Sequence, residues 1–394
     1  MVVQDNRHEE EGMGSGKVRI GVIGCGDIAF RRYLPGFAEI PDQAEVTALF
    51  DLDQDRLGRA AAEYGGRQCT TLAQLLETAE VDAVLNLTPP RAHGPVTLAA
   101  LKAGKHVMVE KPIAGTVAEA DTLIAEAAAR GLTLVCAPGI TRDAFMIDLR
   151  RLVQDGAIGE VTHARLQLAT YGPAAWSEYT SDPTWFYQPG AGPLVDLGVY
   201  MLHSITEILG PVQRLSAMAG ISIPERTVLA GLAEGREIVV TVEDNIQTLL
   251  EFAPPTNASG RPAFVHLDSN YCSWASPGPM IEIYGSNGVF AVDSIYDPRG
   301  IIRLWRGGKN SAHAWEVVPP LSTRAGSNRG NHIFAAASHL VACLRLDRAP
   351  LLSAEHARHV LEVMLLAGEA AREGRTLAPR TTFPYPKPWQ EWED

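Results

Sequence analysis

Short apolar runs alternate with helical segments in the first third of the chain. Between the runs, apolar residues recur at three- and four-residue spacing, as in the alanine-rich stretch from Thr116 to Arg130. Uninterrupted apolar runs are typical of strands buried on both faces, and their alternation with helices is typical of a parallel sheet covered on both sides. The pattern predicts an α/β fold with a doubly wound parallel sheet of six strands, whose apolar runs include 18–23, 45–50, 81–87, 107–109 and 132–137.

The pattern changes after residue 144, where short strand-like segments follow one another with turn signals between them. The sequence Gly285-Ser286-Asn287-Gly288 is typical of a hairpin turn. We expect a C-terminal α+β domain with a large, open, mostly antiparallel sheet, through which a homodimer or homotetramer forms. The predicted strands lie at 161–169, 214–218, 237–242, 246–252, 263–268, 280–284, 289–292 and 301–305, and the predicted helices at 146–155, about 331–346 and 354–372.

A glycine-rich turn joins the first strand to the first helix. It reads Gly24-Cys25-Gly26-Asp27-Ile28-Ala29, in which the glycines let backbone N–H groups approach a pyrophosphate and the alanine lets helix and strand pack closely. We expect Gly24, Gly26, Asp27, Ile28 and Ala29 to bind a dinucleotide.

The second strand ends in Asp51, where a carboxylate accepts hydrogen bonds from both ribose hydroxyls and repels a 2′-phosphate. NAD(H) is therefore favoured over NADP(H). Arg56 is close enough in sequence to reach a phosphate, although pairing with Asp53 or Asp55 is the simpler interpretation.

A charged pair locked to a proline follows the strand at 107–109. Glu110 and Lys111, before Pro112, stand at the carboxyl end of a parallel strand, where open α/β sheets bind ligands. Lys111 is either a structural partner of Glu110 or a catalytic group. Thr88 and Pro89 end the neighbouring strand, and we expect them to bind the cofactor together with Glu110 and Lys111. His93, in the helix that follows, either positions Glu110, Lys111 or the nicotinamide ribose, or makes a local hydrogen bond.

Three polar residues share one stripe of an otherwise apolar helix in the second domain. Asp196, Tyr200 and His203 stand at i, i+4 and i+7 after a Gly-Pro start. Burying such groups costs free energy unless they are paired or used, so the alternatives are a satisfied network at a domain interface and a proton-transfer site. Trp185 and Tyr187, just before this helix, are either part of a cap over the core or a flat platform for a sugar ring.

Charge and cysteine usage limit the classes of partner. A net charge of −12 argues against binding to nucleic acid or anionic membranes. No apolar run approaches the ~20 residues that span a bilayer, and from the polar, acidic composition of Met1 to Lys17 we expect a tail without the apolar core of a signal peptide. The five cysteines show no C-x-x-C spacing, which suits a reducing cytoplasm and gives no indication of a metal site.

Taken together, the glycine turn, Thr88-Pro89 with His93, the segment from Ala103 to Pro112 and the segment from Gly190 to His203 resemble the Gfo/Idh/MocA family. The resemblance covers nearly the whole chain. It implies an NAD(P)-binding Rossmann domain at 17–144 and a substrate-binding and oligomerisation domain at 145–394. The polar, acidic composition of residues 1–16 separately predicts a disordered tail. It also implies oxidoreduction of a sugar or polyol. Inositol dehydrogenases of the family carry His at the position of Tyr200, and many members carry Asp at the position of His203.

The resemblance implies a catalytic group of Lys111, Asp196 and Tyr200. We expect Tyr200 to be the general acid/base, with the positive charge of Lys111 lowering its pKa and stabilising an alkoxide. Asp196 orients Lys111 or the substrate hydroxyl. His203 binds substrate, or replaces Tyr200 as the base.

Two other functions compete with this one. The first is a non-catalytic, dinucleotide-sensing regulator, which would need none of these three side chains. The second is NAD-dependent glycoside cleavage on the same fold.

Overall fold

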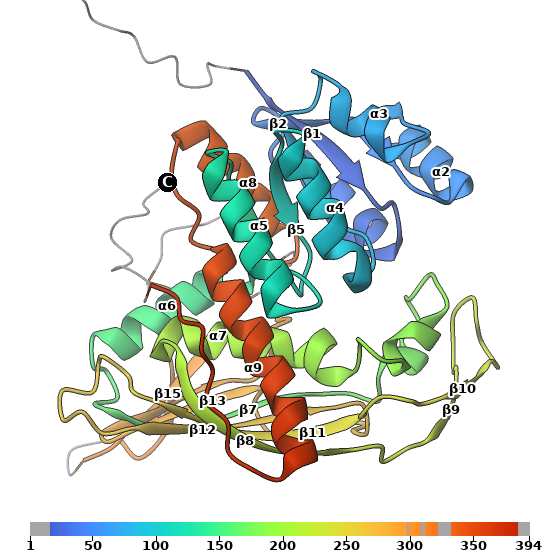
Figure 1. Cartoon of the computed structure of the whole chain (residues 1–394). Helices are drawn as coiled ribbons and strands as arrows, with labels where there is room; N and C mark the ends of the chain where they lie inside the picture. The colour runs from blue at the N-terminus through green and yellow to red at the C-terminus, as the bar shows by residue number, and fades with distance from the viewer. Residues whose placement is uncertain (1–15, 298, 309–311, 322–331, 385–394) are drawn as a thin grey trace, which may run out of the picture.

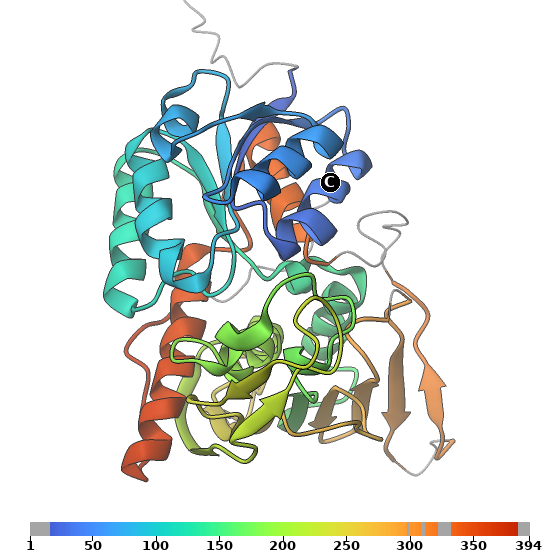
Figure 2. The same cartoon turned by 90° about the vertical axis from the view of Figure 1, so that its right-hand side faces the viewer.

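Two large sheets with their helices dominate the described part of the molecule (Figures 1 and 2). The computed structural model describes residues 16–297, 299–308, 312–321 and 332–384. Apart from residue 16, the predicted disordered tail at 1–16 lies outside the described residues. None of the helices within these ranges is long and apolar enough to cross a membrane.

The N-terminal sheet has six parallel strands in the order β3-β2-β1-β4-β5-β6, which is the order of a Rossmann fold. The predicted doubly wound parallel sheet is therefore confirmed. The apolar pattern does not reveal β3, because this strand has only two residues and both are exposed. The strands are β1 (Val18–Ile23), β2 (Ala44–Phe50), β3 (Arg67–Gln68), β4 (Ala83–Asn86), β5 (His106–Val109) and β6 (Leu134–Cys136), and the helices are α1 (Leu34–Gly36), α2 (Gln54–Tyr64), α3 (Leu72–Glu77), α4 (Pro90–Lys102) and α5 (Val117–Ala129).

Two segments wind more widely than an α-helix. A π-helical segment, Ala29–Tyr33, follows the glycine turn, and a second, Leu194–Gly198, precedes α7 (Val199–Leu209). Wide turns of this kind are rare and occur frequently at functional sites. Here both of them carry residues of the site described below.

The C-terminal sheet has eight strands in the order β16-β15-β14-β13-β7-β12-β11-β8. Only β7 and β12 pair in parallel, so the expected mostly antiparallel sheet is confirmed. The predicted strand at 237–242 is wrong as a member of this sheet, because Glu237–Val239 (β10) pairs with Glu225–Thr227 (β9) in a separate ribbon. The eight are β7 (Val161–Ala169), β8 (Val212–Gly220), β11 (Asn245–Phe252), β12 (Ala263–Asn270), β13 (Ile281–Gly285), β14 (Gly288–Val292), β15 (Ile302–Arg306) and β16 (Trp315–Val317).

The helices divide unequally between the sheets. α6 (Ala144–Gln154), α7 and α9 (Ala354–Glu373) lie on one face of the large sheet, and none of the helices in the described ranges covers the other face, called the uncovered face below (Figure 1). α8 (Ala335–Leu346) instead packs on the N-terminal sheet, where Phe334, Leu340 and Val341 share a core with β1. A single boundary near residue 144 therefore does not separate the two units.

Candidate active site

The glycine turn forms a cradle with space for a dinucleotide. Gly24 has φ +95°, and a Cβ there would stand 2.8 Å from the Leu87 carbonyl oxygen, so a side chain is excluded. A Cβ at Gly26 would meet nothing nearer than the Arg56 guanidinium at 4.0 Å. Asp51 holds the turn by accepting the Cys25 N–H at 2.7 Å. This open backbone beside a carboxylate fits the pyrophosphate and ribose of NAD.

The Asp27 carboxylate is hydrogen-bonded by residues outside the glycine turn. Its carboxylate accepts hydrogen bonds from the Arg31 guanidinium, and from both the N–H and the hydroxyl of Thr180 at 3.0 and 2.6 Å. Thr180 belongs to the loop between β7 and α7 of the C-terminal unit, which also contains Trp176, Tyr179 and Trp185. Asp27 therefore ties the glycine turn to that loop, a role that the sequence does not reveal.

His93 supports two loops at the carboxyl edge of the sheet. Its Nδ1 lies 2.6 Å from the Pro112 carbonyl oxygen and its Nε2 lies 2.7 Å from the Thr88 carbonyl oxygen. Burial lowers the pKa of His93, so the neutral ring has one N–H to donate between the two carbonyls. Thr88 is held in turn by Asn86, whose side-chain oxygen accepts its hydroxyl at 2.6 Å. His93 is thus a positioning residue for the loops that carry Thr88 and Lys111.

Lys111 reaches across to the second unit. Its Nζ donates to Asp196 Oδ1 at 3.0 Å and to the Asp196 backbone oxygen at 2.9 Å. The alternative of an ion pair with Glu110 is wrong, because Glu110 instead accepts the hydroxyl of Tyr33 at 2.6 Å and the backbone N–H of Lys111. An ammonium group has three protons, so one remains for a ligand.

Asp196 is held from two sides and stands close to Tyr200. Tyr271, which follows β12, donates its hydroxyl to Asp196 Oδ2 at 2.9 Å. The Lys111 ammonium lies 5.2 Å from the centre of the Tyr200 ring. In the part of the chain that the structure describes, the Tyr200 hydroxyl has no hydrogen-bond partner. The site thus presents one free lysine proton and one phenol.

The surroundings of Lys111 and Tyr200 keep both side chains protonated. Burial lowers the pKa of Lys111, but the carboxylates of Asp196 and Glu110 outweigh it, so the net pKa is raised. Burial raises the pKa of Tyr200 well above its usual value, and the negative charges of Glu110 and Asp196 add to this effect. The expected lowering of the Tyr200 pKa by Lys111 is therefore wrong for this state, because Asp196 neutralises the ammonium.

Comparisons with known proteins identify the fold and the family. Residues 18–137 match the model of an oxidoreductase family with an NAD-binding Rossmann fold, and residues 146–291 match the GFO/IDH/MocA C-terminal domain. The chain belongs to the Gfo/Idh/MocA family. A dTDP-3,4-didehydro-2,6-dideoxy-alpha-D-glucose 3-reductase from Streptomyces violaceoruber is 36% identical over 293 residues, which cover 73% of this chain and 78% of the reductase.

Two further relatives act on sugars by name. A D-glucoside 3-dehydrogenase from Escherichia coli is 30% identical over 61% of this chain and 68% of its own length. Among solved structures, the levoglucosan dehydrogenase complex with NADH and levoglucosan has a TM-score of 0.78 at 18% identity, covers 93% of this chain and all of its own, and shows the likeness of fold.

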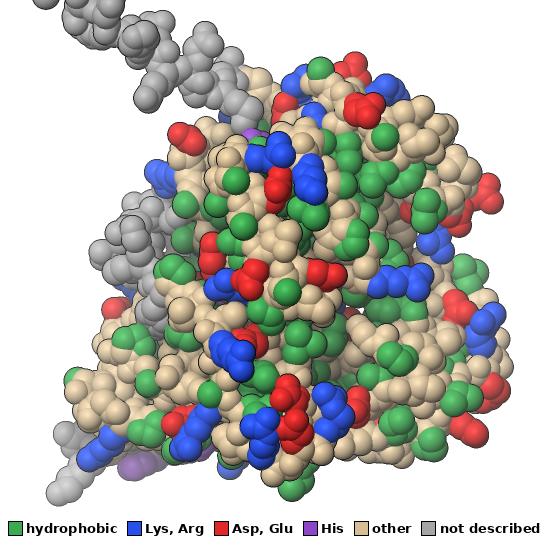
Figure 3. Space-filling view, viewed as in Figure 1, with side chains coloured by type: hydrophobic (Ala, Val, Ile, Leu, Met, Phe, Trp, Pro, Cys, Tyr) green, Lys and Arg blue, Asp and Glu red, His purple; other side chains and the backbone are tan. Residues whose placement is uncertain are grey.

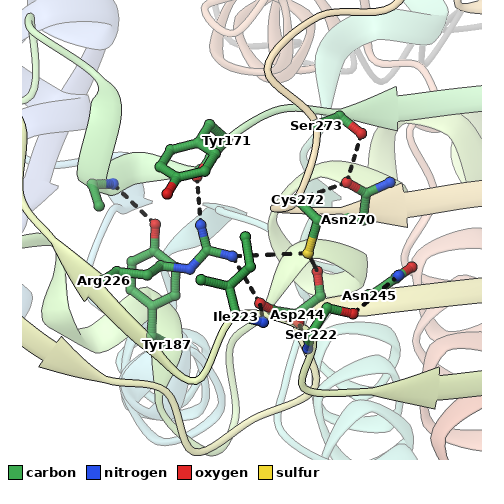
Figure 4. Close-up of polar contacts among 12 residues, drawn as sticks. Tyr171, Tyr187, Ser222, Ile223, Arg226, Asp244, Asn245, Asn270, Cys272 and Ser273 are labelled. Atoms are coloured by element: carbon green, nitrogen blue, oxygen red, sulfur yellow. Dashed lines mark hydrogen bonds and ion pairs between the residues drawn. The ribbon is translucent and has the colours of Figure 1, made fainter.

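Within the Gfo/Idh/MocA fold, Tyr187 packs beside Tyr271, the residue that donates a hydrogen bond to Asp196. Its hydroxyl accepts the N–H of Ala174 at 3.0 Å, and its ring lies 5.4 Å from that of Tyr271. The fully buried Arg226 lies between the rings of Tyr171 and Tyr187 and pairs with Asp244 at 2.7 Å (Figure 4). The structure thus shows Tyr187 in a buried network rather than with a free hydroxyl.

Trp185 is more accessible to solvent than Tyr187. It is 41% exposed, stacks on Phe186 at 3.7 Å and donates its Nε1 hydrogen to the Tyr179 hydroxyl at 3.0 Å. Part of its ring is free for a ligand. Substrate binding by Trp185 stays a prediction.

His203 is packed against α9. Its ring lies 4.8 Å from that of His356, and no hydrogen bond, ion pair or ring contact among the described residues joins it to Lys111, Asp196 or Tyr200. Burial lowers the pKa of His203 to about 3, and it also lowers the pKa of His356 and His359. These rings are neutral members of the core, so this position does not support substrate binding or base catalysis by His203.

The neutral histidines predict acid sensitivity. Their unfolded pKa is about 6.5 and their folded pKa is lower, so below pH 6.5 the unfolded chain binds protons that the folded chain does not. The free energy of unfolding then falls by up to about 1.4 kcal/mol per pH unit for each histidine. Glu207, whose pKa burial raises to about 7, acts in the opposite direction.

We therefore expect His203→Leu to show a shallower loss of stability than the wild type between pH 6.5 and 5 in urea titrations. Equal slopes would contradict it.

Proposed function

We propose that this chain transfers hydride between NAD(H) and a secondary alcohol or ketone of a sugar or polyol, with Lys111, Asp196 and Tyr200 as its catalytic group. One observation carries the proposal: a buried ammonium and a phenol, contributed by different units, stand together at the carboxyl edge of the Rossmann sheet. The family membership and the relatives named as sugar reductases and dehydrogenases support it.

The protein's own groups handle the oxygen of the substrate. Bound NAD(H) supplies or accepts the hydride at its nicotinamide. Lys111 donates its third proton as a hydrogen bond to the substrate oxygen and stabilises negative charge as it develops there. Asp196, fixed by Tyr271, holds the lysine in place. Tyr200 donates its proton to a ketone oxygen, or takes one back from the alcohol in the reverse direction.

In the reducing direction, the reaction starts from the protonation state that Tyr200 has in this structure. Tyr200 begins as a phenol, because burial and the nearby carboxylates raise its pKa. A phenol is ready to give a proton to a ketone, whereas oxidation first requires the phenolate. The Streptomyces relative is likewise named as a reductase.

We also propose a preference for NAD(H). The two oxygens of Asp51 accept the N–H groups of Cys25 and Asp53 at 2.7 and 2.8 Å, and each keeps a lone pair for a ribose hydroxyl. Arg56 pairs with Asp53 at 3.4 Å, which supports the surface ion-pair interpretation.

A substrate panel tests the reaction and the coenzyme together. We expect turnover of at least one compound among sugars, inositols and glycosides, assayed with NAD⁺ and NADP⁺, with a lower KM for NAD⁺. Asp51→Ala raises the KM for NAD⁺ about tenfold, the scale of one lost charge-assisted hydrogen bond. NADH binding without any turnover would instead indicate a sensor. Release of p-nitrophenol from a nitrophenyl glycoside without net NADH would indicate glycoside cleavage.

A dimer through the large sheet is part of the proposal. Met218, Leu249 and Phe264 lie on the uncovered face and are 81%, 53% and 45% exposed. Elsewhere, on the face seen in Figure 3, charged side chains of both signs are interspersed among scattered hydrophobic ones. Neighbouring exposed apolar side chains of this kind favour association with a second copy.

The association state is measurable by light scattering. We expect the wild type to have the mass of a dimer or tetramer, and Leu249→Glu with Phe264→Glu to reduce it to a smaller species. Leu365→Glu, at an exposed leucine of α9, is the matched control and leaves the mass unchanged. A monomeric wild type, or an unchanged mass in the double variant, would rule out this interface.

A further inference from the structure

Two side chains that no sequence motif indicates lie beside Tyr200. The ring of His332 is 6.0 Å from that of Tyr200 and nearly perpendicular to it, and the ring of Tyr296 is 5.6 Å from that of His332. Loss of hydration raises the pKa of Tyr296, the charge of Asp196 adds to the rise and that of Lys111 opposes it, so Tyr296 shares the electrostatic environment of the catalytic group. The residue is 48% exposed, so it also borders solvent. Tyr296 follows β14 and His332 precedes α8, so distant segments converge here.

His332 carries an unpaired polar atom in a buried place. Its residue is 8% exposed, and its Nε2 has no hydrogen-bond partner among the described residues. Burial lowers the pKa of His332 to about 4, so the ring is neutral at pH 7 and offers one donor and one acceptor nitrogen. Most buried polar side chains in folded proteins are paired, and an unpaired one calls for a specific explanation.

The backbone, rather than side-chain hydrogen bonds, fixes this imidazole. A Cβ at Gly139 would overlap the carbonyl oxygen of His332, so the chain before α8 lies directly on the turn that follows β6. Two residues later, the buried ring of Phe334 occupies the space beside Gly36 and packs on Phe37 at 5.2 Å. Close packing therefore fixes the backbone that carries the imidazole, whose Nε2 has no partner among the described residues.

We infer that His332, together with Tyr296, binds the hydroxyl next to the carbon that exchanges hydride, and so selects cyclic vicinal diols over isolated alcohols. The inference rests on the proposed function, in which Tyr200 contacts the reacting oxygen. On a sugar or cyclitol ring the adjacent hydroxyl stands one carbon from the reacting one, and in the inferred pose it meets His332 and Tyr296, whose rings lie near that of Tyr200. A hydroxyl both donates and accepts, which matches a neutral imidazole beside a phenol.

A pair of simple alcohols isolates this contact. Cyclohexane-1,2-diol and cyclohexanol differ by the one hydroxyl in question, and both are assayed with NAD⁺. We expect the wild type to show a kcat/KM at least tenfold higher for the diol, and His332→Leu to bring this ratio close to one, mainly by slowing the diol. His332→Gln, which keeps a donor and an acceptor, restores part of the preference.

Thermal stability separates a binding role from a structural one. His106 is the matched control, because its Nδ1 already accepts the N–H of Thr133 at 2.9 Å. We expect His106→Leu to lower Tm and His332→Leu to leave Tm unchanged or higher, since it removes an unpaired buried group. An unchanged diol preference in His332→Leu would overturn the inference while the proposed function stands. A wild type that turns over neither these alcohols nor the sugar panel would overturn both.

Discussion

Lys111→Ala should lower kcat by about 10³-fold while NADH still binds. The variant loses the ammonium that stabilises negative charge on the substrate oxygen, and groups of this kind contribute about 10²–10³ in rate. It also leaves Asp196 with Tyr271 as its only described side-chain partner, so the carboxylate no longer has a neutralising cation. Steady-state kinetics measure the loss, and quenching of protein fluorescence by NADH measures coenzyme binding.

Lys102→Ala is the control for this variant. Lys102 is an exposed lysine at the end of α4, nine residues before Lys111, and its removal should change neither kcat nor NADH binding. A Lys111→Ala enzyme with more than a tenth of wild-type kcat would show that the ammonium is structural. Loss of NADH binding together with a lower Tm would show the same.

Tyr200→Phe should lower kcat by about 10²–10⁴-fold with little change in fold, because the change removes one oxygen and keeps the ring. Proton transfer by a positioned side chain contributes this much to a rate. The raised pKa of Tyr200 adds a second expectation. In the reducing direction the wild-type rate stays level through neutral pH, because the phenol remains protonated, whereas oxidation speeds up as the pH rises.

Tyr284→Phe is the matched control for Tyr200→Phe. Tyr284 lies on the large sheet, stacked on His163 at 4.3 Å, and its removal should leave kcat unchanged. Full activity of Tyr200→Phe would assign the proton transfer to another group. His332 would then be the first candidate, because its ring is beside Tyr200, whereas the ring of His203 packs against α9.

Local motifs predict the parts of the site that depend on strand ends. The glycine turn, Asp51 and Lys111 each follow a buried strand, and the carboxyl ends of parallel strands meet at one edge of a sheet. The strand order of the parallel sheet therefore brings the glycine turn, Asp51 and Lys111 to the same edge. Asp196 is found by its apolar helix context, and the structure brings it to within 3.0 Å of Lys111.

The remaining residues depend on contacts that no local pattern encodes. Tyr271 reaches Asp196 from 75 residues away, and Tyr33 reaches Glu110 from 77 residues away. The expected stripe assumes uniform α-helical spacing, but Asp196 lies in the π-helical segment and His203 in the α-helix that follows. Tertiary packing decides which side of α7 is covered by α9. The sequence therefore does not show that Tyr200 and His203 have different environments.

The position of α8 has a consequence for how the chain is made. The last strand of the Rossmann sheet ends at Cys136, and the helix that completes its core begins at Ala335. At a synthesis rate of ~5–20 residues per second, the ribosome needs roughly 10–40 s to cross the interval of about 200 residues. Throughout that time the nascent Rossmann sheet exposes the apolar surface that Phe334 and Leu340 will cover. The first domain to emerge is thus among the last to be finished.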